Sequence, residues 1–425
     1  MRLAACAIAA LFACCVLTAR AASVNIVEQP DSSADLTGTE VVLQAGRDRQ
    51  NAKQDGLAAL VAQSILETPV QGQTSLEEAV NANGGSITYT VDPRNVRFYL
   101  EGLNRTYPAL LDLLRTALSK PDFSDATLAA ARKELDQKIA DGERVPLTVG
   151  INMLNRAFYS DSAGMGPYGL PATLAGFTPN DAQTFYAQHY RRGDAIVSTV
   201  GNLSNVPNSS LAALVAGLPA GTSTQANVTM GQLPSTTREL LARRDVSVPW
   251  LVAQYPAPPV TSKDFGAMLV LTAFMQRTLG DVSEVPTIAT KSAAARGVGA
   301  YYNFDARPAN VIIYVDGGLG DPTRTFATAL TVVNVLGHAK LGGDLNDMKA
   351  YAVGRLLQNT TTLQDRAWLA AVFSSSGVSG DYLQHAIGAI NATTSDDLQR
   401  VAARYLGAPT IALVLPRAQE GAQSP

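Results

Sequence analysis

One helix–strand unit occurs twice along the chain. Residues 177–190 have the apolar spacing of a helix and precede the apolar strand 195–200; residues 392–405 repeat this helix before the strand 410–414. Each helix begins at a threonine with an aspartate three residues later, which is typical of a capped N-terminus. Three pairs of landmarks are separated by the same 215 residues: Thr178 and Thr393, Tyr190 and Tyr405, and Ile196 and Ile411.

A second unit supports a duplication. Residues 84–103 and 297–319 each have the pattern of strand, turn and strand, each opened by glycines. Asn95 and Asn310 within them are again 215 residues apart, so four landmarks share one offset. Any α/β chain contains some similar pairs, but a shared offset favours two copies. The sequence therefore predicts an α+β fold of two homologous mixed α/β domains, each a largely antiparallel sheet packed with helices.

Composition places the boundary between the copies. Residues 219–237 are rich in Gly, Ser, Thr, Gln and Pro without periodicity, as is typical of a linker. We therefore expect an N-terminal domain over 22–218, a linker over 219–237, a C-terminal domain over 238–418 and a flexible tail over 419–425. The second domain is expected to open with the strand 246–253, followed by a long apolar helix over 264–279.

The first 21 residues have the features of a signal peptide. A basic start is followed by the apolar run 3–17 and by a small-x-small site that ends at Ala21. We expect cleavage after Ala21, and a periplasmic or secreted protein. Cys14, one of the three cysteines that all lie in this segment, could instead carry a lipid anchor; the bulky Phe12 disfavours this alternative. No later apolar stretch is long enough for a transmembrane helix.

The charge balance and the low histidine content argue against two classes of function. The chain has 425 residues, with 33 Lys and Arg against 36 Asp and Glu, which argues against a nucleic-acid partner. Only 3 histidines are present, so a histidine-rich metal site is disfavoured from the outset. We find no glycine-rich phosphate loop, no Gly-x-Ser-x-Gly nucleophile turn and no cysteine nucleophile outside the first 21 residues.

Several motifs in order resemble a known family. These motifs are Gly84–Thr90, the helix 110–118, Lys120–Phe123, Pro167–Gly169 and the Phe185–Tyr190 block. Together with the duplication, they resemble the insulinase/pitrilysin family of zinc peptidases, M16, in its short bacterial form with two homologous halves. This form is similar to the processing-peptidase subunits and to the core proteins of the cytochrome bc1 complex. The resemblance covers nearly all of the chain after the signal segment.

The catalytic motif of that family is missing. The resemblance implies His-x-x-Glu-His on the first long helix, with two histidines that bind Zn²⁺ and a glutamate that acts as general base. Aligned on residues 56–66, the three positions hold Ala59, Ala62 and Gln63, and the third zinc ligand of the family falls at Lys138. A protonated lysine cannot ligate zinc. We therefore expect a degenerate zinc site, no bound metal and no cofactor; Gln63 could hydrogen-bond water there or simply pack.

The resemblance also implies a substrate grip in the second half, made by an arginine and a tyrosine. Tyr301 matches the tyrosine when one inserted glycine is allowed. Ala293 occupies the place of the arginine, so the pair is incomplete unless Arg296, our candidate, or Lys291 substitutes for it. The alternative is that Tyr301 packs on a strand and Arg296 marks a turn. We expect structural roles for the three histidines: His189 lies between aromatic residues at a helix end, and His338 and His385 have no other histidine or cysteine near them in the sequence.

The resulting hypothesis is a non-catalytic M16 peptidase-like subunit, not an enzyme by itself. It would pair with a zinc-bearing M16 homologue as a heterodimer, or self-associate, and form a peptide-binding chamber that assists proteolysis. The alternative is a stand-alone periplasmic module that binds peptide or protein, or acts as a scaffold, without proteolysis. An active peptidase with a displaced site is the least favoured reading.

Overall fold

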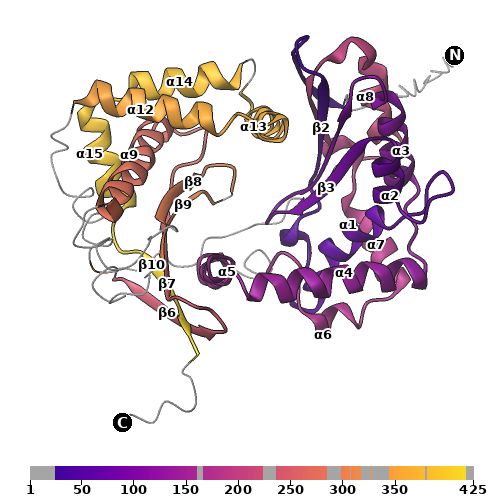
Figure 1. The fold of residues 1–425 in the computed structure, drawn as a ribbon, viewed down its shortest axis with the longest axis horizontal. Helices are drawn as coiled ribbons and strands as arrows, with labels where there is room; N and C mark the ends of the chain where they lie inside the picture. Colours follow the sequence, from indigo (N-terminus) through magenta and orange to yellow (C-terminus); the bar gives the residue numbers. More distant parts are fainter. Residues whose placement is uncertain are drawn as a thin grey trace, which may run out of the picture.

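The structure is a computed structural model that describes residues 24–159, 166–223, 236–284, 298–306, 308–316, 327, 344–378 and 381–417. The signal segment 1–21, most of the linker 219–237, the tail 419–425, Arg296 and His338 lie outside these residues. Figure 1 shows two halves side by side, each with one sheet and its own helices. None of the helices in the described ranges is long and apolar enough to cross a membrane.

The first half is built on a five-stranded sheet in the order β1-β5-β2-β4-β3. β1 runs parallel to β5, and the other neighbours are antiparallel. The strands are β1 (Asn25–Pro30), β2 (Leu36–Leu43), β3 (Gly85–Val91), β4 (Val96–Leu103) and β5 (Ile196–Gly201). The helices are α1 (Leu57–Leu66), α2 (Leu76–Ala82), α3 (Tyr107–Ser119), α4 (Asp125–Glu143), α5 (Pro146–Phe158), α6 (Pro171–Leu174), α7 (Pro179–His189) and α8 (Asn208–Ala216).

The second half repeats this topology, with a sheet in the order β6-β10-β7-β9-β8. β6 is parallel to β10, and the other neighbours are again antiparallel. The strands are β6 (Arg238–Arg244), β7 (Trp250–Pro256), β8 (Val298–Asn303), β9 (Asn310–Asp316) and β10 (Thr410–Pro416). The helices are α9 (Phe265–Glu284), α12 (Leu345–Gln358), α13 (Leu363–Ser375), α14 (Tyr382–Ala392) and α15 (Ser395–Tyr405). The predicted α+β fold with two copies of one unit is confirmed.

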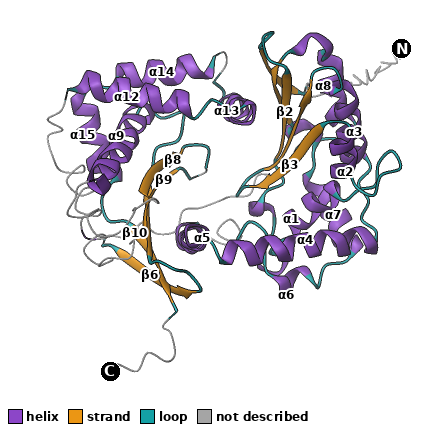
Figure 2. Ribbon diagram, in the orientation of Figure 1, coloured by secondary structure: helices purple, strands orange, loops and turns teal. Residues whose placement is uncertain are grey.

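Each half contributes one helix that packs on the sheet of the other half. Most helices cover the outer face of their own sheet, while α5 and α13 lie between the sheets (Figures 1 and 2). α5 of the first half packs Leu154 against Val252, Ile312 and Ala412 of the second sheet. α13 of the second half packs Ala371 against Val42 and Ile196 of the first sheet. Because each sheet needs an apolar cover on its inner face, this exchange joins the halves through buried surface.

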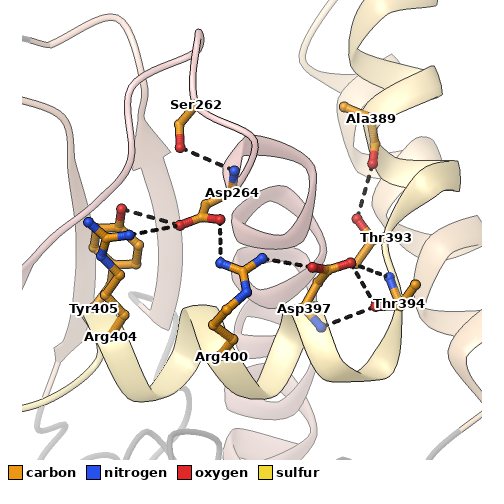
Figure 3. A network of polar contacts seen from close by, with 9 residues as sticks. All are labelled: Ser262, Asp264, Ala389, Thr393, Thr394, Asp397, Arg400, Arg404 and Tyr405. Atoms are coloured by element: carbon orange, nitrogen blue, oxygen red, sulfur yellow. Dashed lines mark hydrogen bonds and ion pairs between the residues drawn. The ribbon is translucent and has the colours of Figure 1, made fainter.

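The helix caps confirm the duplication and correct its register. Thr178 caps α7 and forms a capping box with Asp181, as the sequence predicts. In the second copy the N-cap is Thr394, paired with Asp397, and not Thr393. Thr393 is the C-cap of α14 and donates a hydrogen bond from Oγ1 to the carbonyl of Ala389 (Figure 3). The prediction of Thr393 as the cap was wrong because two adjacent threonines each precede an aspartate by three residues.

The start of the second half also differs from the prediction. Its first strand is β6, residues Arg238–Arg244, and the expected strand 246–253 lies later, as β7. β6 contains four charged residues in seven, so it lacks the apolar alternation by which strands are found. It pairs along its full length with the buried strand β10, which supplies the backbone hydrogen bonds that hold it in place.

Candidate functional site

The helix α1, which is expected to carry the degenerate zinc positions, is packed on every side. All ten residues of α1 are buried; Ala59 and Ala62 are completely inaccessible. Gly56, the N-cap of this helix, has a φ of 94°, and a Cβ atom there would lie 2.8 Å from the Tyr168 carbonyl oxygen. Only glycine fits both requirements. α1 is thus a core helix with two polar side chains. Ser64 donates a hydrogen bond back to the Leu60 carbonyl, and Gln63, at the end of the second turn, is left to bond outside the helix backbone.

Lys138 meets Gln63 from the neighbouring helix. Lys138 on α4 donates a hydrogen bond from Nζ to Gln63 Oε1 at 2.8 Å, and Gln63 Nε2 donates to Glu67 Oε1 at 2.7 Å. The lysine also reaches the edge strand β3, where its Nζ lies 3.4 Å from Tyr89 Oη and 4.5 Å from the centre of that ring. The structure therefore brings Gln63 and Lys138 together, although they are far apart in the sequence.

The charged ammonium of Lys138 has several carboxylates near it. Burial lowers the pKa of Lys138, and the carboxylates of Glu134, Glu77 and Glu67 oppose that shift by favouring the charged ammonium. Tyr168 adds a second ring, 5.9 Å from Nζ, over which a cation is attracted. The ammonium of Lys138 thus lies among carboxylates and aromatic rings.

The zinc ion that the resemblance implies does not fit these residues. Ala59 and Ala62 offer no donor atom, and their positions have no open space for a metal ligand or a base. Gln63 Oε1 already accepts the hydrogen bond of the Lys138 ammonium, whose charge would repel a metal ion. Among the residues that the structure describes, no group of three or more His, Cys, Asp or Glu could hold a metal ion.

Replacing Lys138 by glutamate is expected to lower the free energy of unfolding by about 1–3 kcal/mol. The change removes the hydrogen bond to Gln63 and adds a carboxylate near Glu67 and Glu134. Urea unfolding of the variant and of the wild type measures the difference. Lys133→Glu on the exposed face of the same helix is the control, and should change stability by no more than about 0.5 kcal/mol. Equal effects of the two changes would contradict a structural role for Lys138.

The second predicted site is only partly described. Arg296 lies outside the described residues. Tyr301 lies on β8, an edge strand, with its ring 6.3 Å from that of Tyr314 and packed near α5. It also lines a pocket of about 440 Å³ between β8, α9, α12 and α13, together with Tyr302, Phe304 and Trp368. A volume of that size is in the range of ligand pockets.

The two histidines that the structure describes, His189 and His385, pack against aromatic rings. His189 ends α7 with its ring 4.7 Å from that of Phe185, and burial together with the nearby charge of Arg49 lowers its pKa to about 4. His385 on α14 lies with its ring 5.8 Å from that of Phe373. Such a low pKa keeps His189 neutral at physiological pH.

Sequence reasoning missed a charged cluster at the interface between the halves. Arg97 on β4 forms ion pairs with Glu40 at 2.9 Å and Asp92 at 2.7 Å. Its guanidinium also lies 3.9 Å from the ring centre of Trp368, which α13 contributes from the other half. Trp368 in turn donates a hydrogen bond from Nε1 to Asp305. No local motif marks these residues, because the contact depends on how the two halves pack.

Glu40→Gln is expected to reduce the pH dependence of stability between about pH 4.5 and pH 7. Burial, which outweighs the attraction of Arg97, raises the pKa of Glu40 from 4.5 to about 7. The folded state therefore holds this proton more tightly than the unfolded chain. The resulting stabilisation is complete below pH 4.5 and is lost as the pH rises through 7. Thermal unfolding across this range measures the effect: the Tm of the variant minus that of the wild type should increase with pH, and a constant difference would contradict it.

Comparisons with known proteins agree with this architecture. Residues 25–167 match the family model of insulinase, peptidase family M16. The fold is similar to the inactive domain of a peptidase M16 from Pseudomonas fluorescens, with a TM-score of 0.75, 17% sequence identity and coverage of 95% of this chain and 98% of that one.

A protease from Helicobacter pylori gives a TM-score of 0.78 and 15% identity, covering 93% of this chain and 97% of that one. A chain of complex III2 from Candida albicans gives a TM-score of 0.72 and 14% sequence identity, covering 92% of this chain and 93% of that one. No curated protein sequence matches the chain. Residues 25–167 therefore match the model of the insulinase family, peptidase family M16, and the chain as a whole has the duplicated M16-like fold.

Proposed function

We propose that this protein is a zinc-free, non-catalytic member of the M16 family that pairs with a zinc-bearing homologue. The observation that carries the proposal is the hydrogen bond from Lys138 to Gln63, two residues that the family resemblance aligns with zinc ligands. The ammonium of Lys138, which lies among carboxylates, supplies a positive charge at this site instead of a metal ion. The similarity to a domain described as inactive supports the same conclusion.

The architecture supports a role in holding peptide. The edge strands β3 and β8 each have one side with no partner strand among the described residues. An extended peptide can add to such an edge through backbone hydrogen bonds. In the proposed assembly this chain supplies a peptide-binding wall of the chamber, and its partner supplies the zinc and the attacking water. We further propose export to the periplasm, as the signal segment predicts.

Purification with a zinc-bearing homologue from the same cells tests the pairing. The two chains should elute together in size-exclusion chromatography, and the complex should cleave peptides in a manner sensitive to a chelator. A neighbouring gene for a chain of similar length with His-x-x-Glu-His identifies the partner to use. Separate elution would contradict the proposal. So would stoichiometric zinc after dialysis of this protein alone, combined with chelator-sensitive cleavage.

A stand-alone binding module is the second candidate. It is favoured by the pocket of about 440 Å³ beside β8, which lies within one chain and is lined by Tyr301, Trp368 and other aromatic residues. Such a pocket needs no partner chain to bind an apolar side chain. Calorimetric titration of the isolated protein with a peptide mixture tests it: heat of binding without a partner supports this candidate, and its absence supports the paired assembly.

A further inference from the structure

The helix α13 of the second half covers the inner face of the first sheet (Figure 2). Its apolar contact there is limited to two small clusters, one around Ala371 and one around Ala367. By contrast, each half has a large apolar core of its own. Domains that bury little apolar surface against each other can move relative to one another. The contact of α13 with the first sheet is therefore suited to being reversible.

Two polar side chains lie buried beneath α13 without a full set of hydrogen bonds. Glu40 on β2 and Ser198 on β5 are opposite each other in the antiparallel register, on the same face of the sheet as Val42. Their exposed fractions are 1% and 0%, and neither Glu40 Oε2 nor Ser198 Oγ has a partner among the residues that the structure describes. A buried polar atom without a partner destabilises the state that buries it. Release of α13 would remove this cost, because water could then reach both atoms.

The charges around Glu40 are unequal in number. The guanidinium of Arg97 pairs with Glu40 at 2.9 Å and with Asp92 at 2.7 Å. A third carboxylate, that of Asp305 in the second half, accepts a hydrogen bond from Trp368 Nε1 and interacts with the charges of Asp92 and Arg97. Three carboxylates thus face one guanidinium at the place where α13 meets the first sheet.

The remaining charged groups around this carboxylate are engaged elsewhere. Glu101 on β4 accepts a hydrogen bond from the hydroxyl of Tyr99, and β5 carries no charged residue. α13 contributes Asp365, which accepts a hydrogen bond from the threonine that caps the helix, and Arg366, which pairs with Asp31 at 3.3 Å. Within the described part of the chain, Arg97 is therefore the cation that balances Glu40.

The docked position of α13 favours the neutral form of these carboxyl groups. Burial raises the pKa of Glu40 from 4.5 to about 7, although Arg97 opposes the shift. Burial and the charge of Asp92 also raise the pKa of Asp305, which acts in the same direction. When α13 leaves the sheet, Glu40 is hydrated and its pKa returns toward the ordinary value. Docking should then weaken by about tenfold per pH unit between about pH 4.5 and pH 7, and no further above pH 7.

We propose that α13 is a pH-sensitive latch between the two halves, which docks on the first sheet while Glu40 is neutral and releases that sheet when Glu40 is ionised. In the docked state the ring centre of Trp368 lies 3.9 Å from the guanidinium carbon of Arg97. Release separates these two groups and opens the cavity of about 190 Å³ between the halves, which Trp368 and Asp305 line. The proposal does not rest on the zinc-free function, since none of these residues enters that argument.

A thiol buried under α13 measures how often the latch opens. Residues 22–425 contain both halves and no cysteine, so Ser198→Cys gives them a single thiol. A thiol reagent reaches this position only when α13 has left the sheet. The labelling rate is corrected for the thiolate fraction, which is measured on the same chain in urea. The corrected rate should rise by about tenfold per pH unit between pH 5 and pH 7 and then level off.

Two further variants show whether the thiol reports on the latch. Val197→Cys places the thiol on the opposite face of β5, in the core of the first half, where only unfolding exposes it. At pH 7 its labelling should be at least about tenfold slower than that of S198C, because release of α13 requires less than unfolding of the half. Glu40→Gln in the S198C chain keeps the shape of the side chain without its ionisation, and should remove most of the rise with pH.

Three results would overturn the proposal. Equal labelling rates of S198C and V197C would mean that the reagent reaches position 198 by unfolding of the first half. A corrected rate for S198C that is constant from pH 5 to pH 8 would show that docking of α13 does not depend on pH. An equal rise with and without Glu40→Gln would show that a group other than Glu40 controls the helix.

Discussion

At about pH 9, where Glu40 is ionised in spite of its raised pKa, Arg97→Met is expected to lower the free energy of unfolding by about 3–5 kcal/mol. Arg97 forms ion pairs with Asp92 and with Glu40, whose side chain is only 1% exposed. Without the guanidinium, the Glu40 carboxyl remains buried with no opposite charge. The variant also loses the cation that lies over the ring of Trp368, and with it a contact between the two halves.

A double-mutant cycle separates the ion pair from the contact with Trp368. The variant E40Q/R97M removes both charged partners, so no uncompensated carboxyl remains at position 40. It should recover a substantial part of the loss seen in R97M, because neutral groups cost less to bury than charged ones. The part not recovered reports the contacts of Arg97 with Trp368 and Asp92. Guanidinium chloride unfolding of the four proteins gives the free energies of the cycle.

The matched control for Arg97→Met is Arg115→Met. Arg115 pairs with Asp112 on the surface of α3, where both side chains are well exposed. Surface pairs of this kind contribute about 0–1 kcal/mol, so the control should be close to the wild type. If R97M were as mild as the control, or if E40Q gave no recovery, Arg97 would not have the role assigned to it.

Local patterns predicted the parts of this fold that depend on local interactions. Thr178 caps α7 because its hydroxyl satisfies a free backbone N–H three residues on, and that requirement is visible in the sequence. The shared offset of 215 residues revealed two copies of one unit, since repeats leave their order in the chain. The charged strand β6 was missed because its position is fixed by β10, far away in the sequence.

The candidate site shows the same limit. The family resemblance predicts that Gln63 and Lys138 occupy zinc positions, but it does not indicate that Lys138 donates a hydrogen bond to Gln63. Nor could the sequence show that Tyr89 and Tyr168 surround the ammonium. These contacts join two helices, an edge strand and a loop, so only tertiary packing brings them together. The same holds for the exchanged helices α5 and α13, which no local pattern marks.

Gly150→Ala is expected to lower the free energy of unfolding by about 2 kcal/mol, because it would push α5 away from the second sheet. A Cβ atom at Gly150 would lie 2.5 Å from Val252 Cγ2 and 3.1 Å from Val252 Cβ. Val252 is fully buried on β7, and its branched side chain has little freedom to turn aside. Since α5 belongs to the first half and β7 to the second, the strain acts directly on the interface between the two halves.

Gly354→Ala on α12 is the matched control for Gly150→Ala. A Cβ atom there would have no other atom within 4 Å, so only the helix propensity changes. Alanine is favoured over glycine inside a helix by about 1 kcal/mol, and this variant should therefore be slightly more stable than the wild type. The two Gly→Ala changes are thus expected to have opposite signs in urea unfolding. Hydrogen exchange should show faster exchange in both α5 and β7 of G150A; unchanged exchange in β7 would show that α5 does not hold the two halves together.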